Sequence, residues 1–463
     1  MNDAMHRRRA IEPLFPALAA AALLSGAATA QDKPVPAKPD QRYARAIAAG
    51  YKAATLCGAV FNAGRTQPAV ESLELRGIYP EYAALVPMLT ATIDRTTPRV
   101  TVPFAPDLPA RQATWQRGRG CTLAPIGAMP PPVVTTYARQ PAPASSDPRP
   151  WPMGDAGIRP APSPALTSVV ARAFYAYGEG SQTVGVVVLN DGKIVAEQYR
   201  DGFGPFVANR TWSVAKSISG TLVGMAGVDP QRPANIPEWQ SGDPRRTIKL
   251  DDLLRMASGL HSDTAGNRTD AIYFGGTTVT EQVPSWPLEA KPATRFRYAN
   301  NDILLAVRSL RASLGNAAYA QLPQSLFTTL GMTHTVAQRD WQGNYILSSD
   351  AWSTARDLAR LGQFWLQDGV WQGKRVLPAG WMAYMTTPSG PQPDRAEGYG
   401  ATMWLFGEKQ GLPAGSYAAQ GNRGQYVMVI PAERLVVVRR GEDPTGSSFD
   451  IARFTADVLA ASR

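Results

Sequence analysis

The density of proline in the middle of the chain limits the fold more than any other feature. The stretch "RQPAPASSDPRPWPMGDAGIRPAPSP" ends at residue 164, and a second proline cluster begins near residue 125. Proline fixes φ and lacks a backbone N–H, so such a segment holds neither a helix nor an internal strand. We predict an extended connector over 126–164, between a small unit at 41–125 and a large domain at 165–463. A connector this long is unusual in a compact fold, so we expect it to wrap the domain that follows.

The first thirty residues have the pattern of an export signal. Arg7, Arg8 and Arg9 precede an apolar run over 14–24, and "ATA" at 28–30 is a small-x-small cleavage pattern. We therefore predict a signal peptide over 1–30, a polar linker over 31–40, and a periplasmic or secreted protein. The apolar run is short for a membrane span, and an uncleaved anchor helix is the alternative. No other segment is apolar and long enough to cross a membrane.

The chain has two cysteines, Cys57 and Cys121. An exported protein meets an oxidising compartment, so we predict a disulfide between them. It would close a loop of about 60 residues and stabilise the protein by a few kcal/mol. The alternative is a pair of buried thiols. Two distant cysteines with no histidine between them do not suggest a zinc site.

Apolar periodicity predicts the class of each unit. Residues 41–57 have helical spacing and 99–104 alternate like a strand, so 41–125 reads as a small α+β unit stapled by the disulfide. In the larger domain, a helix from 165 precedes a hairpin at 183–200 that turns at Asn190-Asp191-Gly192. A second hairpin at 425–440 precedes a helix at 448–461. Further helices are predicted at 213–226, 250–257, 300–314 and 353–367. This order suits an α+β fold: an antiparallel sheet, flanked by terminal helices on one face, with an inserted helical lobe.

Charge and histidine content argue against several functions. The formal net charge is +10, but it comes from scattered arginines without a long basic run, which does not suggest a nucleic-acid partner. Histidine occurs only as His6, His261 and His334, and His6 leaves with the signal peptide. A Ser-His-Asp triad would need one of the other two, and no metal-binding cluster such as His-Glu-x-x-His is present. We expect no metal and no cofactor, and any hydrolytic base to be other than histidine.

The stretch "TWSVAKSISG" at 211–220 offers such a base. Ser213 would lie at the positive end of a helix whose apolar stripe predicts burial, and Lys216 one turn later on the same side. A desolvated lysine has a lowered pKa, so its neutral amine could accept the proton of Ser213. The alternative is two ordinary polar residues, because the chain's single Ser-x-x-Lys is by itself a weak signal.

A second element is Tyr298-Ala299-Asn300, the only Tyr-x-Asn in the chain, just before a predicted helix. A tyrosine hydroxyl beside a neutral lysine can relay a proton to a leaving group, and an amide can orient a substrate. Alternatively, Tyr298 packs in the core and Asn300 caps the helix.

Four segments in one order resemble a known superfamily: "WSVAKS", "LDDLLRMASGL", "YANND" and "GNRGQYVMVIPAERLVVV". Together they are similar to the serine β-lactamases and penicillin-binding proteins, within these to class C-like hydrolases, and above all to those of the 6-aminohexanoate-dimer hydrolase type. The resemblance covers about 165–463 and implies a β-lactamase/transpeptidase-like fold. It also implies that Ser213 is the acylated nucleophile and Lys216 its base. Tyr298 would share the proton transfers, and Asn300 would face the substrate.

The third motif of this superfamily, usually Lys-Thr-Gly or a His-Gly variant, corresponds here to Gln420-Gly421-Asn422. By the resemblance, Gly421 lets the backbone approach the acyl group, and the amides of Ser213 and Asn422 form the oxyanion hole. The cation that meets a substrate carboxylate in the family is missing. Arg423 either replaces it or points outward.

The sequence therefore predicts a serine hydrolase acting on a small-molecule amide, ester or peptide. The alternatives are a non-catalytic sensor that binds penicillin or peptide, a cell-wall D,D-peptidase, and a class C β-lactamase. Trp212, Tyr399 and Trp404 are candidates for the pocket wall, although core packing is the commoner role of such aromatic residues. Neither the substrate nor the oligomeric state is indicated.

Overall fold

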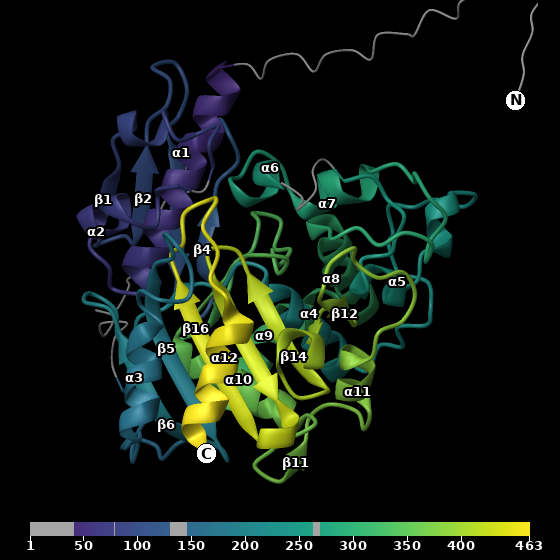
Figure 1. The fold of residues 1–463 in the computed structure, drawn as a ribbon. Coiled ribbons are helices and arrows are strands. Elements are labelled where there is room, and N and C mark those ends of the chain that lie inside the picture. Colours follow the sequence, from purple (N-terminus) through teal and green to yellow (C-terminus); the bar gives the residue numbers. More distant parts are fainter. Residues whose placement is uncertain (1–40, 78, 130–145, 263–268) are drawn as a thin grey trace, which may run out of the picture. The chain divides into compact units, whose positions relative to one another are not determined.

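A computed structural model describes residues 41–463 apart from 78, 130–145 and 263–268 (Figure 1). The predicted signal peptide and linker over 1–40 lie outside the described residues, as does much of the predicted connector. The described residues make one compact unit. The division into domains stays a prediction.

A seven-stranded antiparallel sheet is the centre of the fold, with strand order β12-β13-β14-β15-β16-β5-β6. Its strands are β12 Gly398–Tyr399, β13 Trp404–Phe406, β14 Ser416–Gly421, β15 Gln425–Ile430, β16 Leu435–Gly441, β5 Thr183–Asn190 and β6 Lys193–Tyr199. The turn between β5 and β6 has positive φ at Asp191 (48°) and Gly192 (76°), as the Asn-Asp-Gly sequence predicts. Strand β5 is apolar and buried along nearly its whole length, and β16 is fully buried although it includes Arg439 and Arg440, because helices cover both faces of the sheet.

The terminal helices α3 (Pro164–Arg172) and α12 (Ile451–Ser462) pack against each other in front of the sheet, and α10 (Ala355–Leu366) lies behind it (Figure 1). Helix α10 approaches closely because it carries Gly362. A Cβ there would lie 2.5 Å from Cγ1 of Val436 in β16. The predicted antiparallel sheet with terminal helices and the β-lactamase-like fold class are confirmed.

The helical lobe lies beside the sheet (Figure 1). Its helices are α4 Val214–Met225, α5 Leu250–Leu254, α6 Asp270–Tyr273, α7 Val279–Gln282, α8 Asn300–Leu314, α9 Asn316–Leu330 and α11 Trp381–Thr386. Helix α9 was not predicted, because Pro323 interrupts its pattern. Short strands complete the region: β7 Asn209–Arg210, β8 Val336–Ala337 and β9 Ala351–Ser353, with the separate pair β10 Val370–Trp371 and β11 Lys374–Arg375.

The N-terminal region combines helices α1 (Gln41–Cys57) and α2 (Gln67–Ser72) with a four-stranded antiparallel sheet. The strands are β1 Thr92–Asp94, β2 Arg99–Val102, β3 Arg111–Gln116 and β4 Gly120–Leu123. Cys57 at the end of α1 is bonded to Cys121 in β4, with the Cα atoms 6.1 Å apart. The disulfide is confirmed, and the alternative of two buried thiols is wrong.

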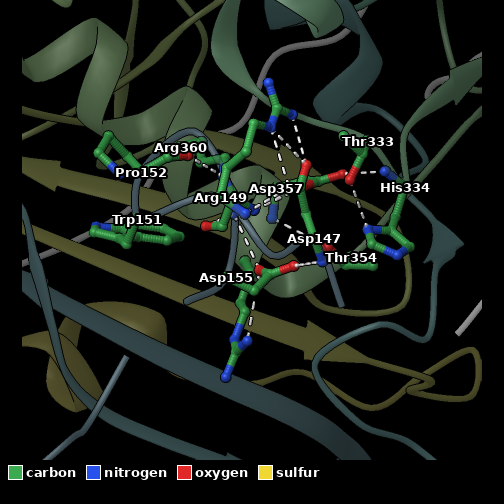
Figure 2. A network of polar contacts seen from close by, with 12 residues as sticks. Asp147, Arg149, Trp151, Pro152, Asp155, Thr333, His334, Thr354, Asp357 and Arg360 are labelled. Atoms are coloured by element: carbon green, nitrogen blue, oxygen red, sulfur yellow. Dashed lines mark hydrogen bonds and ion pairs between the residues drawn. The ribbon is translucent and has the colours of Figure 1, made fainter. Parts of the chain in front are cut away.

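The described end of the predicted connector lies against α10 (Figure 2). Arg360 donates hydrogen bonds to the carbonyls of Pro152 and Gly154, both at 2.6 Å, and pairs with Asp155 at 3.1 Å. Its guanidinium also lies 4.5 Å from the ring centre of Trp151. This segment therefore joins none of the named sheets, and a buried arginine holds it against α10. Among the described helices, none has the length and apolar character needed to cross a membrane.

Candidate active site

Ser213 lies at a sharp bend between β7 and α4. It is the N-cap of α4 and stays half-buried, while the first turns of the helix behind it are fully buried. The preceding residue, Trp212, has φ of 49°, which is a strained conformation for a bulky side chain. The amide of Thr211 holds the bend by donating to the carbonyl of Ala351 at 2.7 Å. The bend leaves the Ser213 hydroxyl at the positive end of a buried helix.

Lys216 lies within hydrogen-bond distance of this hydroxyl. Its Nζ lies 3.0 Å from Oγ of Ser213, 2.6 Å from Oδ1 of Asn300 and 2.7 Å from the carbonyl oxygen of Ser348. The side chain is 1% exposed, and all three partners are neutral oxygens. Burial without a carboxylate partner lowers the pKa of Lys216 to about 7. A large part of the lysine is therefore neutral near pH 7 and able to accept a proton from Ser213.

Tyr298 completes the cluster. Its ring centre lies 5.0 Å from Nζ of Lys216. The ring centres of Trp404 and Tyr399 lie 5.4 Å and 6.1 Å from that of Tyr298. Burial raises the pKa of the Tyr298 phenol, whereas hydrogen bonds with the side chains of Ser213 and Trp404 oppose the rise. The phenol thus stays protonated at neutral pH and shares a hydrogen bond with the serine. Tyr399 and Trp404 are both buried, and their rings pack against the ring of Tyr298.

Strand β14 brings the third motif to the nucleophile. A Cβ on Gly421 would lie 2.4 Å from the carbonyl oxygen of Thr211 and 3.0 Å from the amide nitrogen of Ser213. Only glycine allows the strand to come this close. The exposed residue Asn422 follows at once, so the end of β14 and the start of α4 place two backbone segments side by side. This is the arrangement that a two-amide oxyanion hole needs.

Arg423 does not take the place of the missing cation. Its guanidinium is buried and donates to the backbone carbonyls of Leu73, Glu74 and Arg76 in the N-terminal region. It also pairs with the carboxylate of Glu442 at 2.8 Å. Both alternatives considered for Arg423, a substrate ligand and an outward-facing residue, are therefore wrong.

A comparison with protein-family models identifies the chain. Residues 170–461, more than half of the sequence, match the family described as Beta-lactamase. The chain belongs to the beta-lactamase family.

Related proteins agree with this assignment. The 6-aminohexanoate-dimer hydrolase of Paenarthrobacter ureafaciens is 26% identical over 303 residues, which are 58% of this chain and 74% of that protein. A structure titled "Putative 6-aminohexanoate-dimer hydrolase from Bacillus anthracis" has a TM-score of 0.52 and 21% identity, over 60% of this chain and 78% of that one. The beta-lactamase/D-alanine carboxypeptidase of Pseudomonas syringae has a TM-score of 0.50 and 14% identity, over 65% and 99%. The two structures show the fold, and the family together with the first relative supports a serine hydrolase.

In this beta-lactamase-family site, Ser348 and Tyr273 are functional neighbours that were not predicted from the sequence. The carbonyl of Ser348 binds Lys216, and its hydroxyl lies 2.7 Å from the hydroxyl of Tyr273. Ser348 stands in a segment without regular secondary structure, 132 residues from the lysine. No local pattern marks such a residue, so only the fold reveals it.

Trp212 is separate from the aromatic cluster around Tyr298. The guanidinium of Arg210 lies 4.1 Å from the centre of its ring, and the ring centre of Tyr79, in the N-terminal region, lies 6.3 Å away. Arg210 in turn pairs with Asp350 at 3.6 Å. The residue before the nucleophile is therefore held between β7 and the N-terminal region.

The two histidines within the described ranges, His261 and His334, have partners other than Ser213. The backbone amide of His334 donates to Asp357 at 2.9 Å (Figure 2). The His334 ring lies 5.5 Å from that of Phe206. His261 lies beside Glu289 and stacks on Trp286. These contacts support lysine instead of histidine as the base at Ser213. Within the described ranges, no three histidine, cysteine, aspartate or glutamate side chains gather as in a metal site.

Proposed function

We propose that this protein is an exported serine hydrolase that cleaves an amide or ester bond through an acyl-enzyme on Ser213. The observation that carries the proposal is the contact between Nζ of Lys216 and Oγ of Ser213, 3.0 Å apart, with a lysine pKa near 7. A neutral amine at this distance is a general base for the hydroxyl. Export rests on the pattern of residues 1–30 alone.

In the acylation step, Oγ of Ser213 attacks the carbonyl carbon of the substrate while its proton passes to Nζ of Lys216. The backbone N–H groups of Ser213 and Asn422 stabilise the oxyanion. As the tetrahedral intermediate collapses, the phenol of Tyr298 donates a proton to the leaving amine or alcohol and regains one from Lys216. The bond from the carbonyl carbon to the leaving group breaks, and an ester to Ser213 remains.

In the deacylation step, a water molecule attacks this ester. The phenol oxygen of Tyr298 accepts a proton from the water as its own proton passes to Nζ of Lys216, and Oγ of Ser213 then leaves with that proton from Lys216. The carboxylic acid product departs, and the enzyme returns to its starting protonation state. No step requires a metal or a cofactor.

The substrate class follows from the altered third motif. Ala419 and Gln420 occupy β14 just before Gly421, and Arg423 is turned away, so none of them presents a cation to a substrate carboxylate. This favours an uncharged amide or ester over a β-lactam. The name of the relative, 6-aminohexanoate-dimer hydrolase, adds linear amide dimers to the candidates.

The proposal is tested with Ser213→Ala on p-nitrophenyl esters, nitrocefin, linear amide dimers and D-amino-acid peptides. We expect the wild type to hydrolyse at least one class and to be labelled by a fluorophosphonate, and Ser213→Ala to lose both. Ser219→Ala is the matched control, since this buried serine of α4 bonds to the carbonyls of Ala215 and Leu347. Turnover retained by Ser213→Ala would refute the assignment.

The missing cation also favours a second candidate, a sensor that is acylated but releases no product. Intact-mass measurement separates the two. A stable adduct on Ser213 that persists for hours without turnover would favour the sensor, whereas an adduct that disappears as product accumulates supports the hydrolase. Hydrolysis of D-Ala-D-Ala peptides alone would instead indicate a cell-wall peptidase.

A further inference from the structure

The N-terminal region contacts the turn between β14 and β15, next to the catalytic machinery. The turn between β14 and β15 carries Asn422, the proposed second oxyanion donor, followed by Arg423. The Arg423 guanidinium is 4% exposed and donates to three carbonyls of the segment that follows α2: Leu73 at 3.1 Å, Glu74 at 3.1 Å and Arg76 at 2.9 Å. A fourth bond goes to the carbonyl of Glu442 at 2.8 Å. One side chain therefore joins the turn to a segment some 350 residues earlier in the chain.

The charge of this arginine is balanced where it lies. Its Nε is 2.8 Å from the carboxylate of Glu442, which also accepts from the amide of Asn209 at 3.1 Å. In the segment itself, Arg65 pairs with Glu74 at 2.8 Å, and Tyr51 donates to the Glu74 carbonyl. A buried cation that lost these partners would carry a large desolvation penalty. If the turn moved away from the segment, Arg423 would lose these partners and the protein would bear that penalty.

The backbone of the turn is equally constrained. Arg423 has φ of 57° and Gly424 has φ of 72°, and a Cβ on Gly424 would lie 1.7 Å from Nη1 of Arg439. The carbonyl of Gly424 accepts from that same Nη1 at 2.9 Å. A left-handed arginine is strained, and such strain persists only where surrounding contacts hold it. The contacts with the N-terminal region are of this kind.

On the other side of Asn422, Gly421 lies against the Ser213 amide, so a shift of the turn would move the Asn422 amide relative to the first donor. We propose that Arg423 is a positioning residue that uses the segment Leu73–Gly77 as a support to hold the Asn422 amide in the oxyanion hole. The inference rests on the proposed function. It makes the disulfide-stapled N-terminal region a part of the catalytic apparatus.

The test is Arg423→Lys in the full chain, with Arg360→Lys as the matched control. Arg360 is also buried and also donates to two backbone carbonyls, but these belong to Pro152 and Gly154 in the connector segment that lies against α10. Lysine keeps the charge but lacks the planar, five-donor fork of the guanidinium, so it cannot span the carbonyls and the Glu442 carboxylate that Arg423 binds together. The amount of fluorophosphonate bound when labelling is complete gives the number of folded active sites. We express kcat per labelled site.

We expect kcat per labelled site to fall about 100-fold in Arg423→Lys, as for loss of one oxyanion donor, with KM nearly unchanged. A boronic acid that mimics the tetrahedral intermediate should bind Arg423→Lys more weakly by a similar factor. Arg360→Lys should lower the melting temperature while keeping kcat per labelled site.

The outcomes separate the two proposals. A wild type that neither turns over nor is labelled contradicts the proposed function. An active wild type together with wild-type kcat per labelled site and wild-type boronic acid affinity in Arg423→Lys overturns this inference alone, because the arginine would then serve folding only.

Discussion

Lys216 is made reactive by the absence of a negatively charged partner among the hydrogen-bond partners of its Nζ. The partners of its Nζ are a hydroxyl, a side-chain amide and a backbone carbonyl, none of which carries a full negative charge. In water the ammonium form would dominate at pH 7. Here the loss of hydration without a counter-charge shifts the balance toward the amine. The same residue beside a carboxylate would be a permanent cation.

This shift predicts a pH profile. Because the neutral amine is the active form, kcat/KM should fall about tenfold per pH unit below a midpoint near pH 7, and level off above it until other groups titrate. Measurement from pH 5 to pH 9 with a neutral ester checks this. Lys216→Arg, which stays charged, should lose activity by about 100-fold or more across the range.

A second buried group titrates in the same window and supplies the control. Burial raises the pKa of Asp302, in helix α8, to about 7. Asp302→Asn removes that carboxyl and retains an acceptor for the Ser258 hydroxyl. The midpoint should stay in place in this variant. If the midpoint disappears with Asp302 and the profile of kcat/KM becomes flat, the assignment of the base to Lys216 is contradicted.

At the scale of elements, ion pairs fasten irregular segments to regular ones. Arg360 on α10 is 1% exposed and pairs with the fully buried Asp357 at 2.9 Å, while its other donors hold the carbonyls of Pro152 and Gly154 (Figure 2). Asp357 also accepts from the amide of His334 and the hydroxyl of Thr335. A proline-rich segment has few backbone donors of its own, so side-chain donors take their place.

This arrangement predicts strong coupling. Arg360→Met should lower the free energy of unfolding by about 3–5 kcal/mol, because it leaves a buried carboxylate without its cation. Combining it with Asp357→Asn should cost at least about 1 kcal/mol less than the sum of the single changes. Urea unfolding of the four proteins measures this cycle. Strict additivity would show that the pair is not coupled.

For the whole molecule, the disulfide links the first helix to the fourth strand across 64 residues. Both cysteines are buried, and α1 packs on the sheet that carries Cys121. The cross-link restricts the unfolded chain, and the restriction grows with the length of the closed loop. The N-terminal region therefore gains stability that its small core would not supply alone.

We predict that Cys57→Ala together with Cys121→Ala lowers the free energy of unfolding by roughly 4 kcal/mol. Urea unfolding with and without reductant measures the effect. The wild type should lose stability on reduction, whereas the double variant should not respond. Equal sensitivity of both proteins to the reductant would contradict the prediction.

The sequence by itself determined the parts that depend on neighbours in the chain. Helical spacing indicated α1, α4, α8 and α10, and the Asn-Asp-Gly turn indicated the β5–β6 hairpin, because these signals act over a few residues. Ser213 and Lys216 are one helical turn apart, so their contact also followed from local geometry. The order of the motifs indicated the family.

Only the tertiary structure decided the features that bring distant residues together. The carbonyl of Ser348 at Lys216, the burial of Arg423 against Leu73, and a helix that contains Pro323 have no local signature. A buried polar group must find a partner wherever the fold offers one, and sequence distance does not enter that requirement. The residues that create the neutral lysine and fix the oxyanion turn were therefore beyond pattern analysis, although the two residues that react were within it.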